Sequence, residues 1–461
     1  MKRIANQPGK RIAALLLTAV MAAAGLGACQ QVAEIAEVAA KVAQPLPAAE
    51  DTLTSLFEIT RAMEKSMASG ETELTIYSAG VSEPELQNIG ENLSTFWGKP
   101  VHYSINSEYK GIEGIVPGRA VDVWNITNNF ELSNNYYVFD YIKNGTPIPE
   151  DKPNAKKIAE MLPSIAAEIF TDPTAGDFEK TLAAHDWLVA NLEYDLSTPS
   201  KGEENGAYGA FLLGRTMCQG YAEALELLLK CYTDVEIVQV VGEALHANSG
   251  GRPIDEPEAE DISGEPPEEG NDEPGDTEAE NGGEAAGEQP GGQPDGQADE
   301  ANGEPPEEGS AKPEPAWGGH AWNAVKIDGR WYQIDATFND PIGNPEGRTS
   351  HFYFGQTDAM MSKNHRWNPE YFPVSDSEDF LFFRRGGLFA EDWEEFEAIV
   401  TGLLAEDPIE TFEVAIRNAT IDEENIQFIY KVRDDLEMLY WSEQAWEDVY
   451  VQSVELYYYN K

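Results

Sequence analysis

Residues 249–316 form an acidic segment that cannot belong to a folded core. The segment consists of Glu, Gly, Pro, Asp, Asn, Gln and Ala, with almost no apolar side chains. From Gly251 to Ala316 it holds 22 acidic residues against Arg252 and Lys312, a net charge of −20. A segment of this composition has too little apolar surface to bury, so we expect it to be disordered. Any compact domain must therefore form from the sequence on both sides of it.

The sequence that follows the acidic segment predicts a β-hairpin. Asp328-Gly329 is a strong two-residue turn signal, and apolar and aromatic residues flank it on both sides. Folding about this turn pairs Ile327 with Arg330. Continuing the same register outward places His320 and Asp335 on one face as diagonal neighbours, with Cβ atoms roughly 7 Å apart. Asp335 can then reach an imidazole nitrogen of His320 and determine which ring nitrogen carries the proton.

The sequence before the acidic segment supplies a nucleophile. Residues 222–230 are predicted to form a helix with an apolar stripe, and Cys218 lies just before its first turn. Unpaired N–H groups and the positive end of the helix dipole favour a thiolate at that place. A cysteine nucleophile, a histidine base and an orienting carboxylate are the three parts of an acyl-transfer site. Cys218, His320 and Asp335 are therefore the candidate catalytic residues.

Three short motifs carry a resemblance to a known family. They are Met217-Cys218-Gln219-Gly220-Tyr221, His320-Ala321-Trp322-Asn323 and Asp335-Ala336-Thr337. With them, residues 177–340 resemble the transglutaminase-like domain of bacterial cell-envelope proteins. The resemblance implies an α+β fold with a papain-like core, in which a helix bearing the cysteine packs on an antiparallel sheet bearing the other two residues. It implies Cys218 as nucleophile, His320 as general base and acid, and Asp335 as the residue that orients His320.

Two upstream segments are similar to the same family. His185-Asp186-Trp187-Leu188 with Tyr194-Asp195 resembles its lead-in helix, and Ala207-Tyr208-Gly209-Ala210-Phe211 resembles the segment before its cysteine. The family pattern implies an oxyanion site formed by backbone N–H groups at Cys218 and a side chain upstream. The candidate oxyanion or supporting residues are Tyr208, Gln219 and Trp322.

The resemblance leaves the reaction open. A thioester on Cys218 passes either to water, as in a peptidase or amidase, or to an amine, as in a protein-glutamine cross-linker. The motifs do not choose between these reactions on the amide bonds of proteins or peptides. Because some family members keep the fold for binding alone, a non-catalytic binding or structural lipoprotein is the alternative. The sequence has no paired cysteines, His-Glu-x-x-His or calcium-loop pattern, so neither a metal nor another cofactor is expected.

The first residues predict export and a lipid anchor. Residues 12–27 are almost wholly apolar after a basic start, but they are too short for a comfortable transmembrane helix. They end in Leu26-Gly27-Ala28-Cys29, which resembles a bacterial lipoprotein signal. We expect residues 1–28 to be removed, Cys29 to be acylated and residues 29–50 to serve as a tether. The protein would then lie on the extracytoplasmic side of the cell membrane or outer membrane. An ordinary secretory signal cleaved near Ala28 is the alternative.

The charge of the chain restricts its partners. The chain has 83 acidic and 31 basic residues, a formal net charge of −52. So acidic a chain does not bind nucleic acid through its phosphates. The resemblance implies a protein or peptide substrate in the envelope, and the lipid implies a membrane. The acidic segment enters the chain between Cys218 and His320. It is either a tolerated surface loop, because closure entropy grows only logarithmically with length, or a screen against anionic substrates.

The remaining cysteine and three of the histidines receive separate interpretations. Cys231 lies on the same predicted helix as Cys218, roughly 20 Å away if that helix is intact, which is too far for a disulfide. We expect it to be a buried apolar residue. His185 and His365 are expected to be packed residues. His246 follows the cysteine late enough to be a rival base, but it lacks the hairpin and the following carboxylate.

Composition divides the chain into three folded parts. We expect an N-terminal α/β module at residues 51–145, a catalytic domain at residues 150–375 interrupted by the acidic segment, and a C-terminal α/β module at residues 388–461. Short strands are predicted at residues 121–124, 136–139 and 351–354.

The two end modules are predicted to be repeats of each other. Residues 51–110 and the residues after 388 both predict the order helix, strand, helix, strand. At an offset of 340 positions, apolar residues meet apolar residues without a gap. The matched pairs are Leu56 with Phe396, Ile59 with Ile399, Met63 with Leu403, Leu74 with Val414, Ile76 with Ile416, Val81 with Ile421, Leu86 with Ile426 and Ile89 with Ile429. Two amphipathic segments of this type also align by chance once their helices and strands are in phase.

Overall fold

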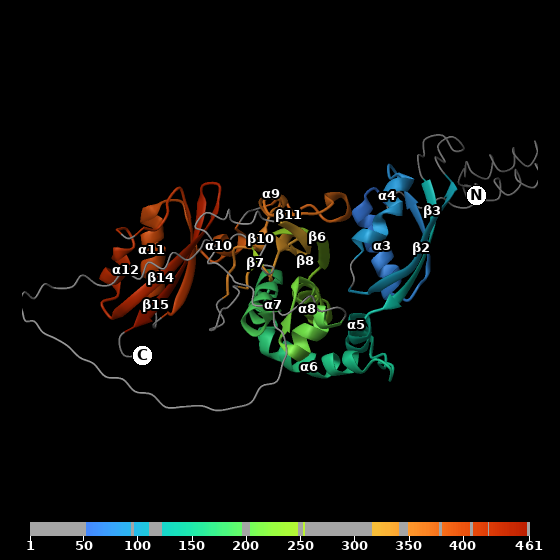
Figure 1. Ribbon diagram of the computed structural model, residues 1–461, viewed down its shortest axis with the longest axis horizontal. Helices are drawn as coiled ribbons and strands as arrows, with labels where there is room; N and C mark the ends of the chain where they lie inside the picture. The colour runs from blue at the N-terminus through green and yellow to red at the C-terminus, as the bar shows by residue number, and fades with distance from the viewer. Residues whose placement is uncertain are drawn as a thin grey trace, which may run out of the picture.

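The computed structural model describes residues 52–93, 96–109, 122–195, 203–247, 252–253, 316–340, 349–377, 380–405, 409–422 and 424–458. The predicted signal peptide and tether, and residues 254–315 of the acidic segment, lie outside the described residues. Among the helices that are described, none combines the length and the hydropathy needed to cross a bilayer. Figure 1 shows three parts in a row, with the N-terminal module at one end and the C-terminal module at the other.

The central part is built on an antiparallel sheet with strands in the order β10, β9, β8, β6 and β11. Their bounds are Phe354–Gln356, Arg330–Ile334, Ala316–Ile327, Ile237–Ala247 and His365–Arg366, and the short strand β7 (Arg252–Pro253) pairs with β6. Helix α8 (Cys218–Tyr232) packs on β8 and β6. Asn323 on β8 donates its side-chain amide to the carbonyl of Ala222 on α8 at 3.1 Å. The helix that begins at Cys218 is thereby held against the strand that carries His320.

Helices cover this sheet because their apolar residues recur at helical spacing. Helices α5 (Asn134–Asn144), α6 (Pro153–Ile169) and α7 (Asp177–Asn191) pack against one another and against α8. On α6, Ile158 and Leu162 are fully buried on one face. The amphipathic pattern of the sequence predicts helices at residues 154–170 and 177–192, and both are confirmed to within about one residue at each end. The shorter elements of this part are β4 (Glu193–Tyr194), η5 (Glu203–Asn205), η6 (Gly209–Leu213), β5 (Arg215–Thr216), α9 (Asp358–Met361), η7 (Pro369–Tyr371) and α10 (Leu381–Arg385).

The strand predicted at residues 136–139 is wrong, because this segment is part of helix α5. Its aromatic residues favour a strand locally, but both helix ends are capped. The hydroxyl of Ser133 accepts from the N–H of Tyr136, and Gly145 ends the helix with a left-handed backbone at φ 73°. The strand predicted at residues 351–354 is also misplaced, since β10 begins only at Phe354.

The hairpin between β8 and β9 has the predicted turn and register. Both turn residues have positive φ, 50° at Asp328 and 81° at Gly329, as the tight hairpin turn requires. Ile327 pairs with Arg330, which confirms the prediction. The ladder ends one residue before Asp335, whose N–H donates to the carbonyl of Tyr353 at 3.0 Å. Asp335 therefore opens a turn instead of extending the strand.

The two end modules share one order of elements. The N-terminal module consists of α3 (Leu56–Ala68), β1 (Glu73–Ser78), α4 (Glu83–Gln87), η3 (Ile89–Asn92), β2 (Gly98–Tyr109) and β3 (Asp122–Leu132). The C-terminal module consists of β12 (Phe389–Ala390), α11 (Trp393–Leu404), β13 (Thr411–Arg417), α12 (Gln427–Val432), β14 (Leu436–Trp446) and β15 (Val449–Tyr458). The strand orders correspond, β1-β3-β2 and β13-β15-β14, with β12 added beside β13. The strand predicted at residues 121–124 is the start of β3, whereas the C-terminal module has one more long strand than the sequence pattern predicts.

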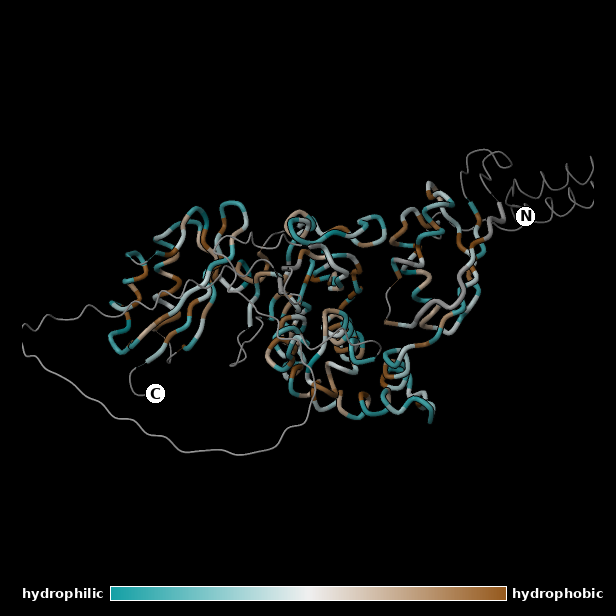
Figure 2. Tube along the Cα trace, viewed as in Figure 1, coloured by the Kyte–Doolittle hydropathy of each residue, from teal (hydrophilic) through white to brown (hydrophobic). Residues whose placement is uncertain are grey.

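Matched residues of the repeat occupy corresponding buried positions. Ile76 on β1 and Ile416 on β13 are both buried, and so are Leu86 and Ile426 at the second helix of each module. Figure 2 shows hydrophobic and hydrophilic residues alternating along the helices and strands of all three parts. The helices and inner strand faces of the C-terminal module form an apolar cluster of their own. The N-terminal module shares one apolar cluster with the central part, and Ala415, Val449 and Val451 of the C-terminal sheet also belong to that cluster.

The ends of the acidic segment lie side by side. In the β6–β8 ladder His246 is opposite Ala316, and Ala247 is opposite Arg252 of β7. The segment thus connects neighbouring strands of one sheet, as the loop of a hairpin does.

Replacing residues 254–315 with a short Gly/Ser linker is expected to leave the melting temperature nearly unchanged. The linker joins β7 to β8, which both pair with β6 at His246, so its ends are close together. Each halving of a flexible loop changes its closure free energy by only about 0.6 kcal/mol. A variant that keeps the length of residues 254–315 but scrambles their order is the control. A large drop in melting temperature for both variants would show that the native segment packs against the domain.

Candidate active site

Cys218 is the first residue of helix α8 and is half-buried. The prediction that the helix begins at Ala222 is therefore wrong by one turn. The helix start lacks the usual N-cap residue, Ser, Thr, Asp or Asn, that marks a helix start in a sequence. The N-cap is Met217, which makes no side-chain hydrogen bond. Gly220 is needed in this turn, since a Cβ there would lie 2.0 Å from the hydroxyl of Thr216. The thiol thus lies at the positive end of the helix dipole.

The thiol of Cys218 contacts the imidazole of His320. Burial raises the pKa of Cys218, but the charge and hydrogen bond of His320 and the N–H of Ala321 outweigh burial, so the pKa is lowered overall. Burial alone lowers the pKa of His320, whereas Asp335 and the thiolate raise it to about 10. The interaction of the two groups therefore favours a thiolate beside an imidazolium, the reactive form of a cysteine nucleophile.

Asp335 orients His320 directly. Its Oδ2 accepts from His320 Nε2 at 2.7 Å, and both side chains are fully buried. Its Oδ1 accepts from the N–H groups of Thr337 at 2.9 Å and Phe338 at 3.1 Å. Burial raises the pKa of Asp335, but the charges and hydrogen bonds around it hold it well below its usual range. Because Nε2 of His320 is used by Asp335, the ring presents Nδ1 toward the cysteine side.

The three predicted supporting residues have different surroundings. Trp322 stacks on His320 with ring centroids 5.8 Å apart and donates its indole N–H to Gln333 at 2.8 Å. Gln219 donates its amide to Glu223 one turn along α8, at 2.7 Å. Tyr208 lies half-buried against the apolar cluster. Trp322 is thus the one of these three that supports the imidazole by a described contact.

Tyr194 lies beside the cysteine, although the sequence pattern placed it with the lead-in helix and not with the candidate site. It lies on β4, where it pairs with Thr216, two residues before Cys218. Burial raises its pKa, and the charges of Cys218 and Asp335 add to that effect. Tyr194 therefore stays a neutral hydroxyl donor next to the thiolate. The sequence signal that could have found it is weak, because a two-residue strand pairing has no periodic pattern.

His365 is not only a packed residue, as the sequence suggested. Its Nε2 lies 2.9 Å from Asp335 Oδ2, the oxygen that also binds His320. The strand β11 that carries it pairs with β6 opposite Ala244, so a short strand far along the chain brings a second imidazole to the site. The rival base His246 lies on the same strand β6, opposite Ala316.

The turn after Asp335 ties the catalytic strand to two helices. Asn339 donates its amide to His185 Nε2 on α7 at 2.9 Å, and its side-chain oxygen accepts from the N–H of Tyr353 at 2.8 Å. Asp340 accepts a short hydrogen bond from the hydroxyl of Tyr221, which lies one turn after Cys218 on α8. Burial raises the pKa of Asp340 to about 7. Helix α8 and the turn after Asp335 are thereby held in one position relative to each other.

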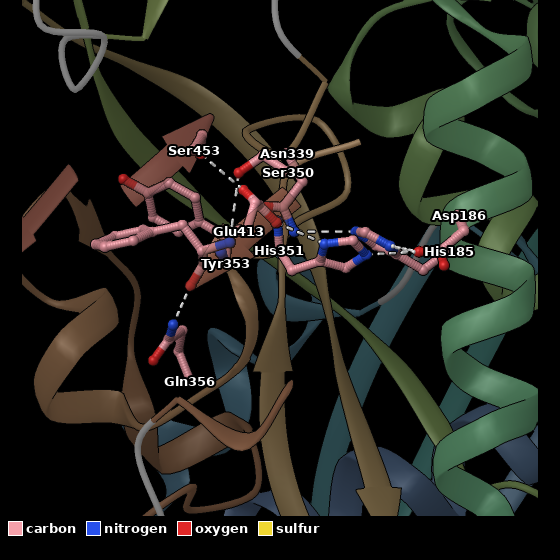
Figure 3. A network of polar contacts seen from close by, with 10 residues as sticks. His185, Asp186, Asn339, Ser350, His351, Tyr353, Gln356, Glu413 and Ser453 are labelled. Atoms are coloured by element: carbon pink, nitrogen blue, oxygen red, sulfur yellow. Dashed lines mark hydrogen bonds and ion pairs between the residues drawn. The ribbon is translucent and has the colours of Figure 1, made fainter. Parts of the chain in front are cut away.

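A second polar network joins this turn to the C-terminal module (Figure 3). Glu413 on β13 accepts from His351 twice, from Nδ1 at 2.7 Å and from the backbone N–H at 3.0 Å. His351 Nε2 donates to Asp186 at 3.0 Å, and His185 Nδ1 contacts the same oxygen at 2.9 Å. Burial lowers the pKa of His185, which is therefore neutral and accepts from Asn339. His351 lies between two carboxylates, which raise its pKa to about 9 against the effect of burial.

Glu413→Gln is expected to weaken the dependence of stability on pH above neutrality. The folded pKa of His351 lies above its ordinary value of 6.5. Its imidazolium therefore stabilises the fold fully below pH 6.5, and this contribution, roughly 3 kcal/mol, is lost as the pH rises through about 9. Denaturant midpoints from pH 6 to 9.5 should fall less steeply in the variant. Glu437→Gln, an exposed position on β14, is the matched control, and parallel curves for wild type and Glu413→Gln would contradict the assignment.

Two groups of side chains contain potential metal ligands. In each group the candidate nitrogen and oxygen atoms lie within 4.8 Å of one another. The groups are His185, Asp186 and His351, and His320, Asp335 and His365. The sequence motifs could not reveal them, because each group is completed by a histidine far along the chain, His351 in the first and His365 in the second. In the first group Asn339 donates to His185 Nε2, so the proton of that ring lies on Nδ1 and faces Asp186. In the second, both imidazoles contact Asp335. Hydrogen bonds within each group therefore explain why these atoms lie close together.

Comparison with known proteins gives no match to a family model and none to a curated protein. A solved structure described as a TGase is similar to 57% of this chain and 50% of its own, with a TM-score of 0.20 and 10% identity. This chain thus spans about half the length of that protein. A candidate cysteine protease from Cytophaga hutchinsonii is similar over 57% of this chain and 74% of its own, with a TM-score of 0.21 and 12% identity.

Proposed function

We propose that this protein is a cysteine enzyme that transfers acyl groups from the amide bonds of proteins or peptides. The observation that carries the proposal is the arrangement of Cys218, His320 and Asp335. The thiol lies at a helix N-terminus with a lowered pKa, and His320 is held by Asp335 at 2.7 Å. A cysteine that served packing alone would not need a buried, charged histidine beside it.

The reaction follows from the protonation states of the pair. The thiolate of Cys218 attacks the carbonyl carbon of an amide, and the carbonyl oxygen becomes an oxyanion. Backbone N–H groups at the start of α8 and the hydroxyl of Tyr194 are the donors for that oxygen. His320 then gives its proton to the departing amine, which leaves a thioester on Cys218. Water or a second amine gives a proton to His320 as it attacks the thioester, and the thiolate is released.

Mass spectrometry in water enriched in ¹⁸O tests the proposal and separates the two outcomes. Cell-envelope proteins are incubated with the wild type or with Cys218→Ala. Hydrolysis places ¹⁸O in a new carboxylate, whereas transfer to an amine creates a cross-link with loss of ammonia. Both changes must depend on Cys218. A wild type whose cysteine reacts with alkylating reagents but that produces neither change would favour a binding protein.

We also propose that the enzyme is anchored to a membrane through lipid on Cys29, a residue outside the described part of the chain. The support is the sequence Leu26-Gly27-Ala28-Cys29 after an apolar stretch. Cys29→Ser is expected to abolish acylation and leave the signal unprocessed, because the acyl chain attaches to the cysteine sulfur. Detergent partitioning and intact mass measure this, with Cys231→Ser as the matched control. Normal cleavage and release of Cys29→Ser as a soluble protein would instead indicate an ordinary secretory signal.

A further inference from the structure

A second buried imidazole binds the carboxylate that orients His320. His365 Nε2 lies 2.9 Å from Asp335 Oδ2, the oxygen that His320 Nε2 contacts at 2.7 Å. All three side chains have 0% exposure. The rings of Phe338 and Tyr353 pack against His365 with centroid distances of 4.7 and 5.8 Å. Three ionisable groups therefore share a space from which solvent is excluded.

Both ring nitrogens of His365 face acceptors. Nδ1 lies 2.7 Å from the side-chain oxygen of Asn364, whose amide nitrogen donates to the hydroxyl of Tyr353 at 2.6 Å. Nε2 faces the carboxylate of Asp335. A neutral imidazole has one N–H and can donate to only one such partner, whereas an imidazolium donates to both. The geometry is therefore that of a ring with two protons.

We propose that His365 is a positioning residue of the candidate active site and that it is an imidazolium. It holds Asp335 in place for His320, and its charge offsets that of Asp335 beside the Cys218–His320 pair. The effect on reactivity rests on the proposed function, but the charge of His365 does not.

A positive charge on His365 lowers the pKa of both Cys218 and His320. Asp335 and His320 face His365 directly, and Tyr353 and Cys218 are one hydrogen bond further away. The pKa of Asp335 is raised by burial, but it is lowered overall by His320 and by His365. A positive charge at His365 favours the thiolate of Cys218 and disfavours a second positive charge on His320. Removing it should therefore raise the pKa of both groups.

The first test is the pH dependence of Cys218 alkylation by iodoacetamide, a neutral reagent. His365→Gln keeps an N–H donor for Asp335 but removes the charge. We expect the midpoint of the thiolate limb to rise by about one pH unit, so that the variant reacts roughly fivefold more slowly at the wild-type midpoint. His351→Gln makes the same change at a histidine whose partners are Asp186 and Glu413, and its midpoint should stay in place. A midpoint that is unchanged or lower in His365→Gln overturns the proposal, even if the melting temperature falls.

The second test does not need a stable variant. In wild-type protein labelled with ¹⁵N-histidine, an imidazolium shows both ring nitrogens at similar chemical shifts, whereas a neutral ring separates them widely. His365 should show the imidazolium pattern at pH 7, and a neutral pattern would contradict the assignment. An inert Cys218 in the wild type would count against the proposed function alone, because the nitrogen shifts still decide the charge of His365.

Discussion

Cys218 is expected to react with a small alkylating reagent at neutral pH at least a hundredfold faster than Cys231. Burial alone raises the pKa of Cys218, but His320 and the N–H of Ala321 lower it overall. Burial raises the pKa of Cys231 to about 12, and that residue is only 5% exposed. The thiolate is the nucleophile, and a thiol of that pKa is ionised at pH 7 to a fraction on the order of 10⁻⁵.

Peptide mass spectrometry after timed labelling measures the two rates separately. His320→Ala should slow the labelling of Cys218 by roughly tenfold to a hundredfold, because the thiol loses the positive charge that stabilises its anion. Cys218→Ala should remove the fast phase, and Cys231→Ala is the control that should leave it intact. Fast labelling of Cys231 in the folded protein, with Cys218 inert, would refute the nucleophile assignment and favour a binding protein.

Asp335→Asn should lower amide turnover by a factor on the order of 10³ to 10⁴, which is the typical loss when the carboxylate of a catalytic triad becomes an amide. All four described hydrogen bonds to this carboxylate come from donors: two imidazoles and the N–H groups of Thr337 and Phe338. An asparagine must direct its own N–H₂ group at one of these donors. His320 also loses the anion that keeps its pKa at about 10.

The ratio kcat/KM on a peptide amide measures this loss, with the melting temperature recorded beside it. Asp328→Asn is the matched control, because it makes the same change in the same hairpin. Asparagine suits the positive φ of 50° at that turn position. A loss of less than tenfold for Asp335→Asn, in a protein that is folded, would mean that Asp335 does not orient the base.

The hairpin and the nucleophile helix were predictable because their signals are local. Asp328-Gly329 sets a turn whose two residues need positive φ, and the pairing of Ile327 with Arg330 follows from it. The same turn brings His320 and Asp335 onto one side of the hairpin. Helix α5 shows the limit of such reasoning, because the aromatic residues at 136–139 favour a strand while the caps at Ser133 and Gly145 make the segment helical.

The contacts that complete the candidate site have no local signal. His365 lies 30 residues after Asp335 in the sequence, and Glu413 lies 62 residues after His351. Each contact depends on how a short strand or turn is placed against the central sheet. A two-residue strand such as β11 has no period that identifies it. These histidines therefore acquire their contacts from tertiary packing, and no feature of the sequence distinguishes them from the other histidines.

The sequence by itself identified the candidate nucleophile, base and carboxylate, because hairpin geometry and helix ends depend on neighbouring residues. It also determined the matching order of elements in the end modules, since hydrophobic periodicity depends on the neighbours of each residue. Only the tertiary structure decided that Asp335 serves two imidazoles, that Tyr194 lies beside Cys218, and that Glu413 of the C-terminal module binds His351. These contacts join residues that are distant in the chain, and their geometry exists only once separate elements have packed into one core.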